Sequence, residues 1–553
     1  MTKSRVVGVL IALATICSPD ARLSGQTSVV MTALQDELAR SMSDLRMKDA
    51  PSPYFISYEL QDRTVTEIAG RLGAIIQDEP RRVRVLRVEV RVGSYEFDNS
   101  RFVMQGFGGG GGSAIGETTL APLEDDYDAL RRAAWITTDQ AYKRAVNTFA
   151  RKRAAFQNRA AASDVIPDFA NETAVQTEVS VDGIRARHDM AGRVQQPSLA
   201  LGTSTDIEAS EVAISEIRGA RYYLNSEGFK SVTPLSLASL VMFAEAQASD
   251  GMPIRETYSD VEKTIDELPL PSELANRARE LASRVTPNPT APLGEEFTGP
   301  VLLEGAGSAE FLAETLVPLM LARRPPDAEN PRAVPGPSTP FLTRTGLRVM
   351  ADAFSVSDAP SLTTFDGKPV PGAYIVDDEG VRAKDVKLVE KGRLVTLLTS
   401  RVPQKNFPHS NGHGRSGGVQ AGVFQVESSQ AIPAADLKAK YLALLKAQDK
   451  TFGYIVRGVY ATGGAGGPGI DRIVKVSLDG KEEPVRGLRF ATVPSTAFRD
   501  LSEASQERFV FNYRAGLAAA TSVIAPSLIF EELEIQRTRE VLQKPPVVTS
   551  PLK

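Results

Sequence analysis

The spacing of hydrophobic and polar residues divides the chain into helical and strand-forming stretches. Residues 29 to 45 place Val30, Leu34 and Leu38 at helical intervals, which predicts an amphipathic helix. Residues 54 to 104 alternate or cluster β-forming residues between polar breaks, as in YFISYELQD and VRVLRVEVRV, which predicts successive antiparallel strands. The alternation changes phase at Val85 and Leu86, so we expect a β-bulge at that point.

The second half of the chain mixes the same two patterns. Residues 301–303 read as a buried strand, and residues 311 to 319 carry an apolar helical face that Pro318 would kink or end. One helix, DLKAKYLALLKAQDK, then interrupts four strand-like stretches, which are IVDDEGV, VKLVEKGRLVTLL, FGYIVRGVYA and RIVKVSLDGKEEPVRGL. Because strands and helices do not alternate regularly, we predict an α+β fold with largely antiparallel sheets and flanking helices.

Length and proline content suggest how the chain is divided. A chain of 553 residues exceeds what one hydrophobic core usually serves, so we expect two domains. Prolines flank a short helical segment between residues 270 and 299, which makes 276–298 the best linker. We therefore predict an N-terminal domain at 27–275 and a C-terminal domain at 299–553.

The first residues resemble an export signal. Lys3 and Arg5 precede an apolar run from Val6 to Cys17, which is shorter than a typical membrane-crossing helix. We expect residues 1–26 to be a secretory signal peptide and the mature protein to be periplasmic or extracellular, with no transmembrane segment. Cys17 is the only cysteine, so the mature protein would have no disulfide, thiolate nucleophile or cysteine-bound metal.

Charge and short motifs exclude several kinds of site. The formal net charge of -4 gives no general attraction to nucleic acid. A G-x-G-x-x-G pattern at 464–469 leads into a strand instead of a helix, so it predicts a hairpin loop and no dinucleotide site. The run of glycines at 108–112 predicts a surface loop, and no serine stands in G-x-S-x-G.

The chain has only three histidines, which are His188, His409 and His413. His409 and His413 are four residues apart, as two metal ligands can be. The glycines around them indicate a loop, so a substrate-lining or structural role is favoured over a pair of metal ligands. Glu314 lies in the apolar helix of residues 311 to 319, where it would ordinarily be a surface carboxylate and less often a catalytic base.

Several phrases, taken in order, resemble the TldD/PmbA family of metallopeptidase-related proteins. They span most of the mature chain and are VRVGSYEFDNS at 90–100, YKRAVNTFARK at 142–152, YYLNSEG at 222–228, GPVLLEGAGSAEFLAETL at 299–316, GAYIVDDEGVRAKDVKLVEKGRL at 372–394 and SNGHGR at 410–415.

This resemblance implies a two-part α+β architecture, assembled as a dimer, in which TldD-type subunits carry an HExxxH zinc helix and PmbA-type subunits lack it. Laid on this chain, the first histidine falls on Ala313, the glutamate on Glu314 and the second histidine on Pro318. The resemblance also implies a downstream cysteine ligand, whereas the only cysteine here is Cys17. We therefore expect no metal or other cofactor in this chain, although a partner subunit could hold zinc.

Our leading hypothesis is an exported, metal-free pseudoenzyme that binds peptide and supports a proteolytic partner, as a homodimer or as a heterodimer with a TldD-type homologue. We expect the peptide to contact Ser410, Asn411, Gly412, His413 and Arg415, beside the helix that carries Glu314. One alternative is an active metallopeptidase that uses His409 and His413 with an acidic residue of DDEG. The other is a stand-alone periplasmic binding or structural protein.

Overall fold

The structure is a computed structural model that describes residues 28–104, 116–157, 166–178, 190–204, 206–286, 290–329, 339–462 and 467–539, with Leu542 and Val548. The predicted signal peptide with Cys17, the glycines at 108–112, His188 and residues 463–466 lie outside these ranges. No helix within the described ranges combines the length and the apolar character that a membrane crossing requires.

The N-terminal half is built on a seven-stranded sheet with the order β4-β2-β1-β6-β7-β5, and β8 also pairs with β7. All of these pairings are antiparallel except that of β5 with β7. The strands are β1 Pro53–Arg71, β2 Ala74–Val92, β4 Glu117–Leu120, β5 Gln176–Glu178, β6 Ala209–Asn225, β7 Lys230–Gln247 and β8 Pro253–Glu262.

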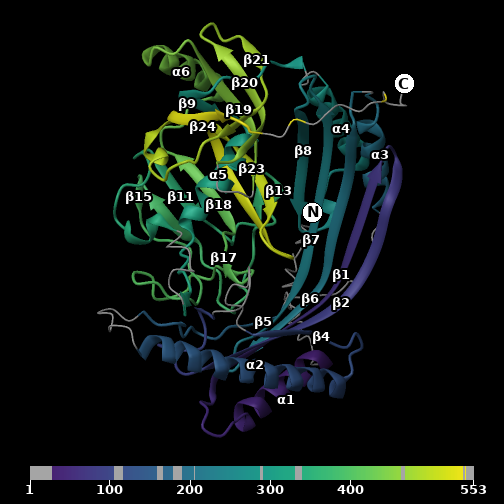
Figure 1. Ribbon diagram of the computed structural model, residues 1–553, viewed down its shortest axis with the longest axis vertical. Coiled ribbons are helices and arrows are strands. Elements are labelled where there is room, and N and C mark those ends of the chain that lie inside the picture. The colour runs from purple at the N-terminus through teal and green to yellow at the C-terminus, as the bar shows by residue number, and fades with distance from the viewer. Residues whose placement is uncertain are drawn as a thin grey trace, which may run out of the picture.

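Helices cover one face of this sheet at its two ends, as Figure 1 shows. The helices α1 (Val29–Asp44) and α2 (Tyr127–Gln157) pack over Tyr58, Leu60 and Val88, and the predicted first helix is thus confirmed. At the other end, α3 (Ala191–Leu201) and α4 (Pro271–Val285) cover a second apolar cluster. Most of α4 lies in the segment 276–298 that we predicted as a linker, and its apolar side chains are part of the N-terminal core.

The bulge predicted at Val85 and Leu86 is wrong. The register of β1 with β2 runs without a shift from Phe55 to Ala69, and its irregularities lie at the two ends. The side chain of Arg84 is fully buried on the core side, where its Nη2 lies 2.6 Å from Oδ2 of Asp62. A buried charged residue therefore takes the place of a hydrophobic one on the core face of β2. The alternation of hydrophobic and polar residues thus changes phase in the sequence, although the strand is regular.

The C-terminal half contains an eleven-stranded sheet with the order β15-β14-β11-β18-β24-β22-β20-β19-β9. Because β9 also pairs with β24, the strands from β24 to β9 close into a ring, while β21 pairs with β20 and β23 with β24. The strands are β9 Phe297–Leu303, β11 Phe354–Asp358, β14 Val386–Glu390, β15 Arg393–Leu394, β18 Val423–Ser428, β19 Phe452–Tyr460, β20 Gly469–Ser477, β21 Glu482–Pro484, β22 Leu488–Phe490, β23 Leu501–Arg514 and β24 Ala520–Arg537.

Two helices and several short elements complete this half. The helices are α5 Ala306–Thr315 and α6 Ala434–Ala447, and the 3-10 helices are η3 Val317–Met320, η5 Pro340–Thr343 and η6 Ala497–Asp500, with η1 Ile265–Glu267 in the N-terminal half. The short strand pairs are β3 Phe102–Val103 with β10 Asp327–Ala328, β12 Thr364–Phe365 with β13 Lys368–Pro369, and β16 Gly414–Arg415 with β17 Gly418–Val419.

One predicted strand of this half is absent, because IVDDEGV at residues 375–381 forms a turn with a single bridge between Val376 and Arg382. The buried carboxylate of Asp377 accepts the backbone N–H groups of Glu379, Val381 and Gly414, and so it fixes the turn. The α+β class and the predominance of antiparallel pairing are nevertheless confirmed.

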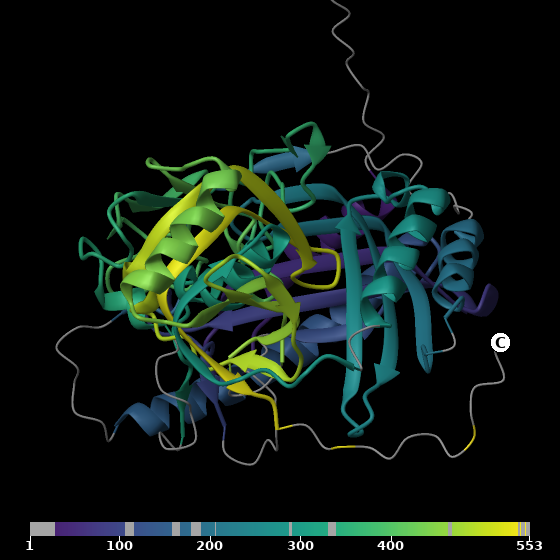
Figure 2. The same ribbon diagram turned by 90° about the horizontal axis from the view of Figure 1, so that it is seen from above.

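Buried polar contacts join the two halves, which lie side by side in Figures 1 and 2. The guanidinium of Arg401 lies 2.7 Å from Oε1 of Glu227, and it donates to the backbone carbonyl of Ala170. The ring of Phe169 contacts two arginines, with the guanidinium carbons of Arg91 and Arg401 3.6 and 3.9 Å from its centre. The halves therefore meet across a packed and hydrogen-bonded junction.

Candidate functional site

Helix α5 carries the positions of the degenerate zinc motif, and a tight turn after β9 sets its start. Gly305 adopts a positive φ of 64°, and its N–H donates to Oγ of Ser527 at 2.9 Å. Gly307 packs directly on the next strand, since a Cβ there would lie 2.6 Å from the carbonyl carbon of Arg457. The sequence GAGSAEF thus lets the helix lie closely on the sheet.

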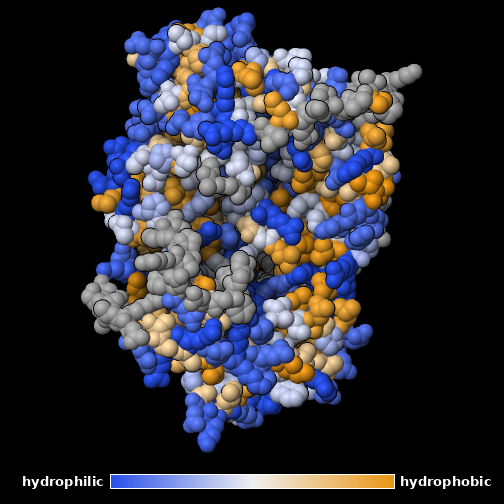
Figure 3. Space-filling view, in the orientation of Figure 1, coloured by the Kyte–Doolittle hydropathy of each residue, from blue (hydrophilic) through white to orange (hydrophobic). Residues whose placement is uncertain are grey.

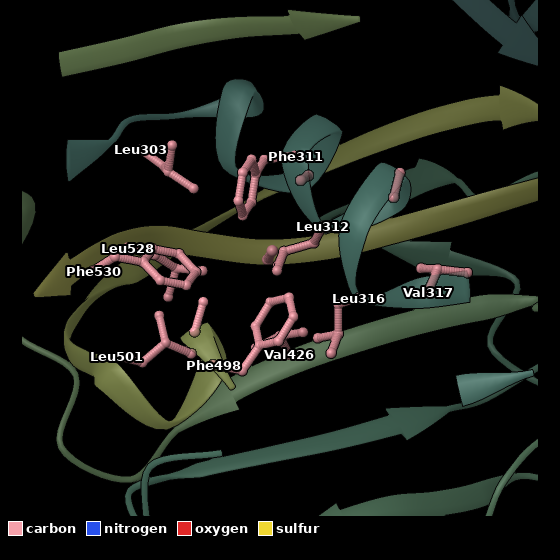
Figure 4. Close-up of a cluster of buried hydrophobic side chains, with 14 of the residues drawn as sticks. Leu303, Phe311, Leu312, Leu316, Val317, Val426, Phe498, Leu501, Leu528 and Phe530 are labelled. Atoms are coloured by element: carbon pink, nitrogen blue, oxygen red, sulfur yellow. The ribbon is translucent and has the colours of Figure 1, made fainter. Parts of the chain in front are cut away.

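The apolar face of α5 is buried in the core of the C-terminal half (Figure 4). Phe311 and Leu312 point into a cluster that includes Phe498 and Phe530, and the ring centres of Phe311 and Phe530 are 5.5 Å apart. This packing fixes the rotation of the helix and therefore decides where each position of the motif points.

The three motif positions have three different environments. Ala313 is buried in the apolar core, whereas Glu314 is exposed. The α-helix ends at Thr315, and Pro318 lies beyond it in the short helix η3, with its side chain exposed. Pro318 is therefore outside the α-helix that carries Glu314, in agreement with the expectation that proline ends the helix.

These residues do not fit the zinc site that the HExxxH pattern would form. Ala313 has no donor atom, and Pro318 has neither a donor side chain nor a backbone N–H. Glu314 is the one position of the three with an oxygen ligand to offer. Among the residues that the structure describes, no group of three or more His, Cys, Asp or Glu side chains is placed to hold a metal ion.

Glu314 lies near a tyrosine that no sequence motif indicates. Partial burial raises the pKa of the Glu314 carboxyl. Burial, together with the charges of Glu314 and Asp358, raises the pKa of Tyr513 to about 12. Tyr513 on β23 is thus close enough to feel both carboxylates, which come from α5 and from the end of β11.

The loop at 410–415 is ordered by its own side chains. The side-chain oxygen of Asn411 accepts the N–H of Thr399 at 2.8 Å, and its amide nitrogen donates to the carbonyl of Leu397 at 2.9 Å. Gly412 has a φ of 82°, and a Cβ there would lie 2.3 Å from the carbonyl oxygen of Arg382. Ser410 is buried, and its hydroxyl accepts the N–H of Gly412.

His413 is fully buried between two acceptors. Its Nδ1 lies 2.9 Å from Oδ1 of Asn411, and its Nε2 lies 3.1 Å from Oδ1 of Asp358, which also accepts the N–H of Gly422. The contacts with Thr399 and Leu397 fix the amide of Asn411, so Nδ1 must donate to its oxygen. His413 therefore fastens the loop to the end of β11.

His409 takes a different partner from His413. Its side chain is 74% exposed, and its Nδ1 lies 3.5 Å from Oε1 of Glu172. Because both ring nitrogens of His413 are already engaged, no lone pair of that ring faces His409. The structure therefore does not bring the two imidazoles together as a pair of metal ligands.

Arg415 is also held within the protein. Its guanidinium carbon lies 4.1 Å from the ring centre of Tyr374, and Nη1 donates to the carbonyl of Ala520 at 3.2 Å. The residues that we predicted to contact peptide thus use their side chains mainly to order the loop, and their contact with a ligand stays a prediction. Asp358 contacts His413 of the loop, and its charge raises the pKa of Tyr513. The charge of Glu314 on the motif helix raises the pKa of the same tyrosine.

Two strands with unpaired edges border this region. Among the described residues, β23 pairs with β24 and, through one isolated bridge at Ser505, with Ile432, while β8 at the margin of the N-terminal sheet pairs with β7 alone. The two strands lie beside each other without forming a ladder. Figure 3 shows a hollow between the two halves in the same view.

Comparisons with known proteins agree on one family. Residues 298–537 match the family described as PmbA/TldA metallopeptidase C-terminal domain. A protein of Methanothermobacter thermautotrophicus named "Metalloprotease" is 27% identical over 206 residues, which are 35% of this chain and 39% of that protein. The aligned part thus spans about two fifths of that curated relative.

Solved structures share the fold over nearly the whole chain. TldE from Thermococcus kodakarensis has a TM-score of 0.57 at 14% identity, covering 91% of this chain and 99% of its own. A protein of Thermotoga maritima named as a modulator of a DNA gyrase has a TM-score of 0.59 at 14% identity, covering 91% of this chain and 100% of its own. At such low identity these likenesses speak for the fold alone. The match at 298–537 places the C-terminal half in the TldD/PmbA family, and the solved structures show that the fold extends over nearly the whole chain.

Proposed function

We propose that this chain is an exported, metal-free member of its family that binds extended peptide and supports a metal-bearing partner subunit in proteolysis. The observation that carries the proposal is the contrast at α5, where the family's fold is kept but the ligand positions are Ala313 and Pro318. The donor atoms of a zinc site are lost, whereas the surrounding elements remain packed.

Loss of the zinc ligands removes the chemistry and leaves the binding surface. In a zinc peptidase the ion polarises the scissile carbonyl and lowers the pKa of bound water to about 7. With Ala313 and Pro318 at the ligand positions, no zinc-bound water would be activated for Glu314 to deprotonate. The carboxylate can still accept a hydrogen bond from a peptide or position a group of a partner.

The unpaired edge of β23 supports extended peptide as the ligand. A strand edge presents unpaired N–H and C=O groups, which an extended peptide satisfies by adding a strand. Between residues 508 and 514 the partner of β23 in the described structure is β24 alone, on one side of the strand. Tyr513 lies in this stretch and senses the charge of Glu314, so a peptide added there would lie near the degenerate motif.

Peptides with selected N-methyl groups test this proposal. A strand added to β23 turns every second amide toward the edge, so methylation of that set removes the hydrogen bonds. We expect the purified chain, treated with chelator, to bind an unstructured peptide and its copy methylated on the outward amides equally well. The copy methylated on the inward amides should bind at least tenfold more weakly, because each lost hydrogen bond costs roughly 1 kcal/mol and about 1.4 kcal/mol is a factor of ten. Equal weakening by both methylation patterns would contradict strand addition.

The partner role has its own experiment. A tagged copy of this chain, recovered from the exported fraction, should bring down a homologue that carries HExxxH, and the pair should cleave a peptide that this chain alone leaves intact. Cleavage by this chain alone that is lost on Glu314→Gln would overturn the proposal in favour of an active metallopeptidase.

A further inference from the structure

Basic side chains from four separate elements gather where the β23–β24 hairpin meets the N-terminal sheet. Arg63 lies on β1, Lys263 directly follows β8, Arg415 lies on β16, and Arg514 is the last residue of β23. Figures 1 and 2 show the hairpin reaching from the C-terminal half onto the long strands of the other half. We refer to these four residues as the basic cluster.

Ala520 connects three members of the basic cluster. It stands opposite Arg514 in the register of the hairpin, and its carbonyl accepts a hydrogen bond from Nη1 of Arg415 at 3.2 Å. The side chain of Ala520 packs against Val261 of β8, which precedes Lys263 by two residues. The tip of the hairpin thus brings these charges to one place on the N-terminal sheet.

The charges are close enough to repel each other. Burial lowers the pKa of Arg63, and the positive charge of Arg514 lowers it further, against the opposing effect of Glu59. Burial likewise lowers the pKa of Lys263; the charges of Glu267 and Glu262 oppose this effect, and that of Arg415 adds to it. Arg514 of the hairpin and Arg415 of β16 therefore lie near the cations of the N-terminal sheet.

None of the four has a carboxylate oxygen within 4.0 Å in the described part of the chain. Arg514 donates to the backbone carbonyls of Gly516 and Leu517, and Arg415 to those of Ala421 and Ala520. Arg63 donates to Gln61, while its Nε is buried without an acceptor. Arg415 is buried, and a buried cation is ordinarily paired, so its arrangement is costly as it stands.

The nearby acids form no direct ion pair with the basic cluster in the described part of the chain. The carboxylate of Glu59 lies 3.3 Å from Arg221, and that of Glu267 accepts the backbone N–H groups of Lys263 and Thr264. Burial, with the neighbouring carboxylates, raises the pKa of Glu262 to about 8, so Glu262 is mostly uncharged at neutral pH. The basic cluster thus keeps an excess of positive charge between the halves.

We propose that the basic cluster binds a carboxylate of an acidic peptide lying along the edge of β23. This inference rests on the proposed function, because Arg514 closes the unpaired stretch of β23 and would meet one end of an added strand. A carboxylate accepts several charge-assisted hydrogen bonds at once, which suits guanidinium and ammonium groups converging from four elements. The carboxylate is either the C-terminus of the peptide or an acidic side chain near that end.

Matched peptides test the inference and separate the two sources. One fluorescent, unstructured peptide is made with a free C-terminus or a C-terminal amide, and with aspartate or asparagine near that end. The peptide that carries the recognised carboxylate should bind roughly tenfold to a hundredfold more tightly than its neutral counterpart, the range expected for charge-assisted bonds. Added salt should reduce this preference.

Substitutions assign the preference to the cluster. Arg514→Gln and Arg63→Gln should each remove most of the preference, so that the acidic and neutral peptides bind with nearly equal affinity. Lys387→Gln is the matched control, because it removes one positive charge from a side chain that is 76% exposed on β14, and it should keep the preference. Arg514 is exposed, so its substitution should fold even if that of Arg63 does not.

The outcomes distinguish this inference from the proposed function. Tight but equal binding of acidic and neutral peptides would overturn the carboxylate site and leave peptide binding standing. Binding of no peptide at all would overturn both. A preference that survives in Arg514→Gln and Arg63→Gln would place the carboxylate elsewhere and refute the assignment to the basic cluster.

Discussion

Glu310 offers the sharpest test of how α5 is held in the C-terminal half. Its Oε2 accepts the N–H of Val459 at 2.8 Å, its Oε1 lies 3.5 Å from Nη2 of Arg472, and its side chain is 15% exposed. Burial raises the pKa of Glu310 to about 7; Arg472 opposes this effect, and Asp471 adds to it. We therefore predict that Glu310→Gln changes the pH dependence of stability.

The sign follows from proton binding. The unfolded chain releases this proton near the ordinary value of 4.5, whereas the folded chain holds it until about 7. The folded state therefore binds more protons in this interval, and the contribution of Glu310 to stability is lost as the pH rises through it. At about 1.4 kcal/mol per pH unit, the gap corresponds to at most about 3 kcal/mol. Glutamine keeps an acceptor for Val459 but does not titrate.

Urea unfolding followed by circular dichroism measures the effect. The free energy of unfolding of Glu310→Gln, relative to the unsubstituted protein, should rise by up to about 3 kcal/mol between about pH 4.5 and about pH 8. Glu483→Gln is the control, because Lys481 lowers the pKa of Glu483 and the pH trend should not have the same sign. A difference for Glu310→Gln that is independent of pH, or that falls as the pH rises, would refute the reasoning.

Three further outcomes are expected. His413→Gln removes the ring that bridges Asn411 and Asp358 and leaves buried hydrogen-bonding groups unsatisfied, so the free energy of unfolding should fall by roughly 1 to 3 kcal/mol, and unchanged urea denaturation would contradict the buried contact. Ala313→His should bind far less than one zinc per chain, since one ligand cannot replace a full set, and near-stoichiometric zinc by elemental analysis would contradict this. The native protein should begin between residues 18 and 28 and be found outside the cytoplasm, and mass spectrometry that finds an intact N-terminus in the cytosolic fraction would exclude export.

Periodicity alone predicts much of the fold. The helix at 29–45 and the strand that precedes α5 follow directly from apolar spacing, because each buries one continuous face. It fails where polar groups take the place of apolar ones. The buried Arg84 hides a regular strand, and Asp377 turns a segment that reads as a strand.

The candidate site, like the fold, could be predicted only in part from the sequence. The sequence identifies the motif positions and the loop at 410–415, since both lie in contiguous phrases. It does not indicate Asp358 or Tyr513, which reach the region from distant strands and belong to no motif. The sequence also does not predict that His413 is buried and holds the loop in place, because its partner Asp358 is 55 residues away in the sequence.

The proposed function requires that this chain bind peptide without a metal. Titration of an unstructured peptide into the chelator-treated chain, repeated after zinc is added back, tests it most directly. We predict the same dissociation constant in both titrations, with no zinc retained and no peptide cleaved. Binding or cleavage that appears only with zinc, at about one ion per chain, would contradict the claim.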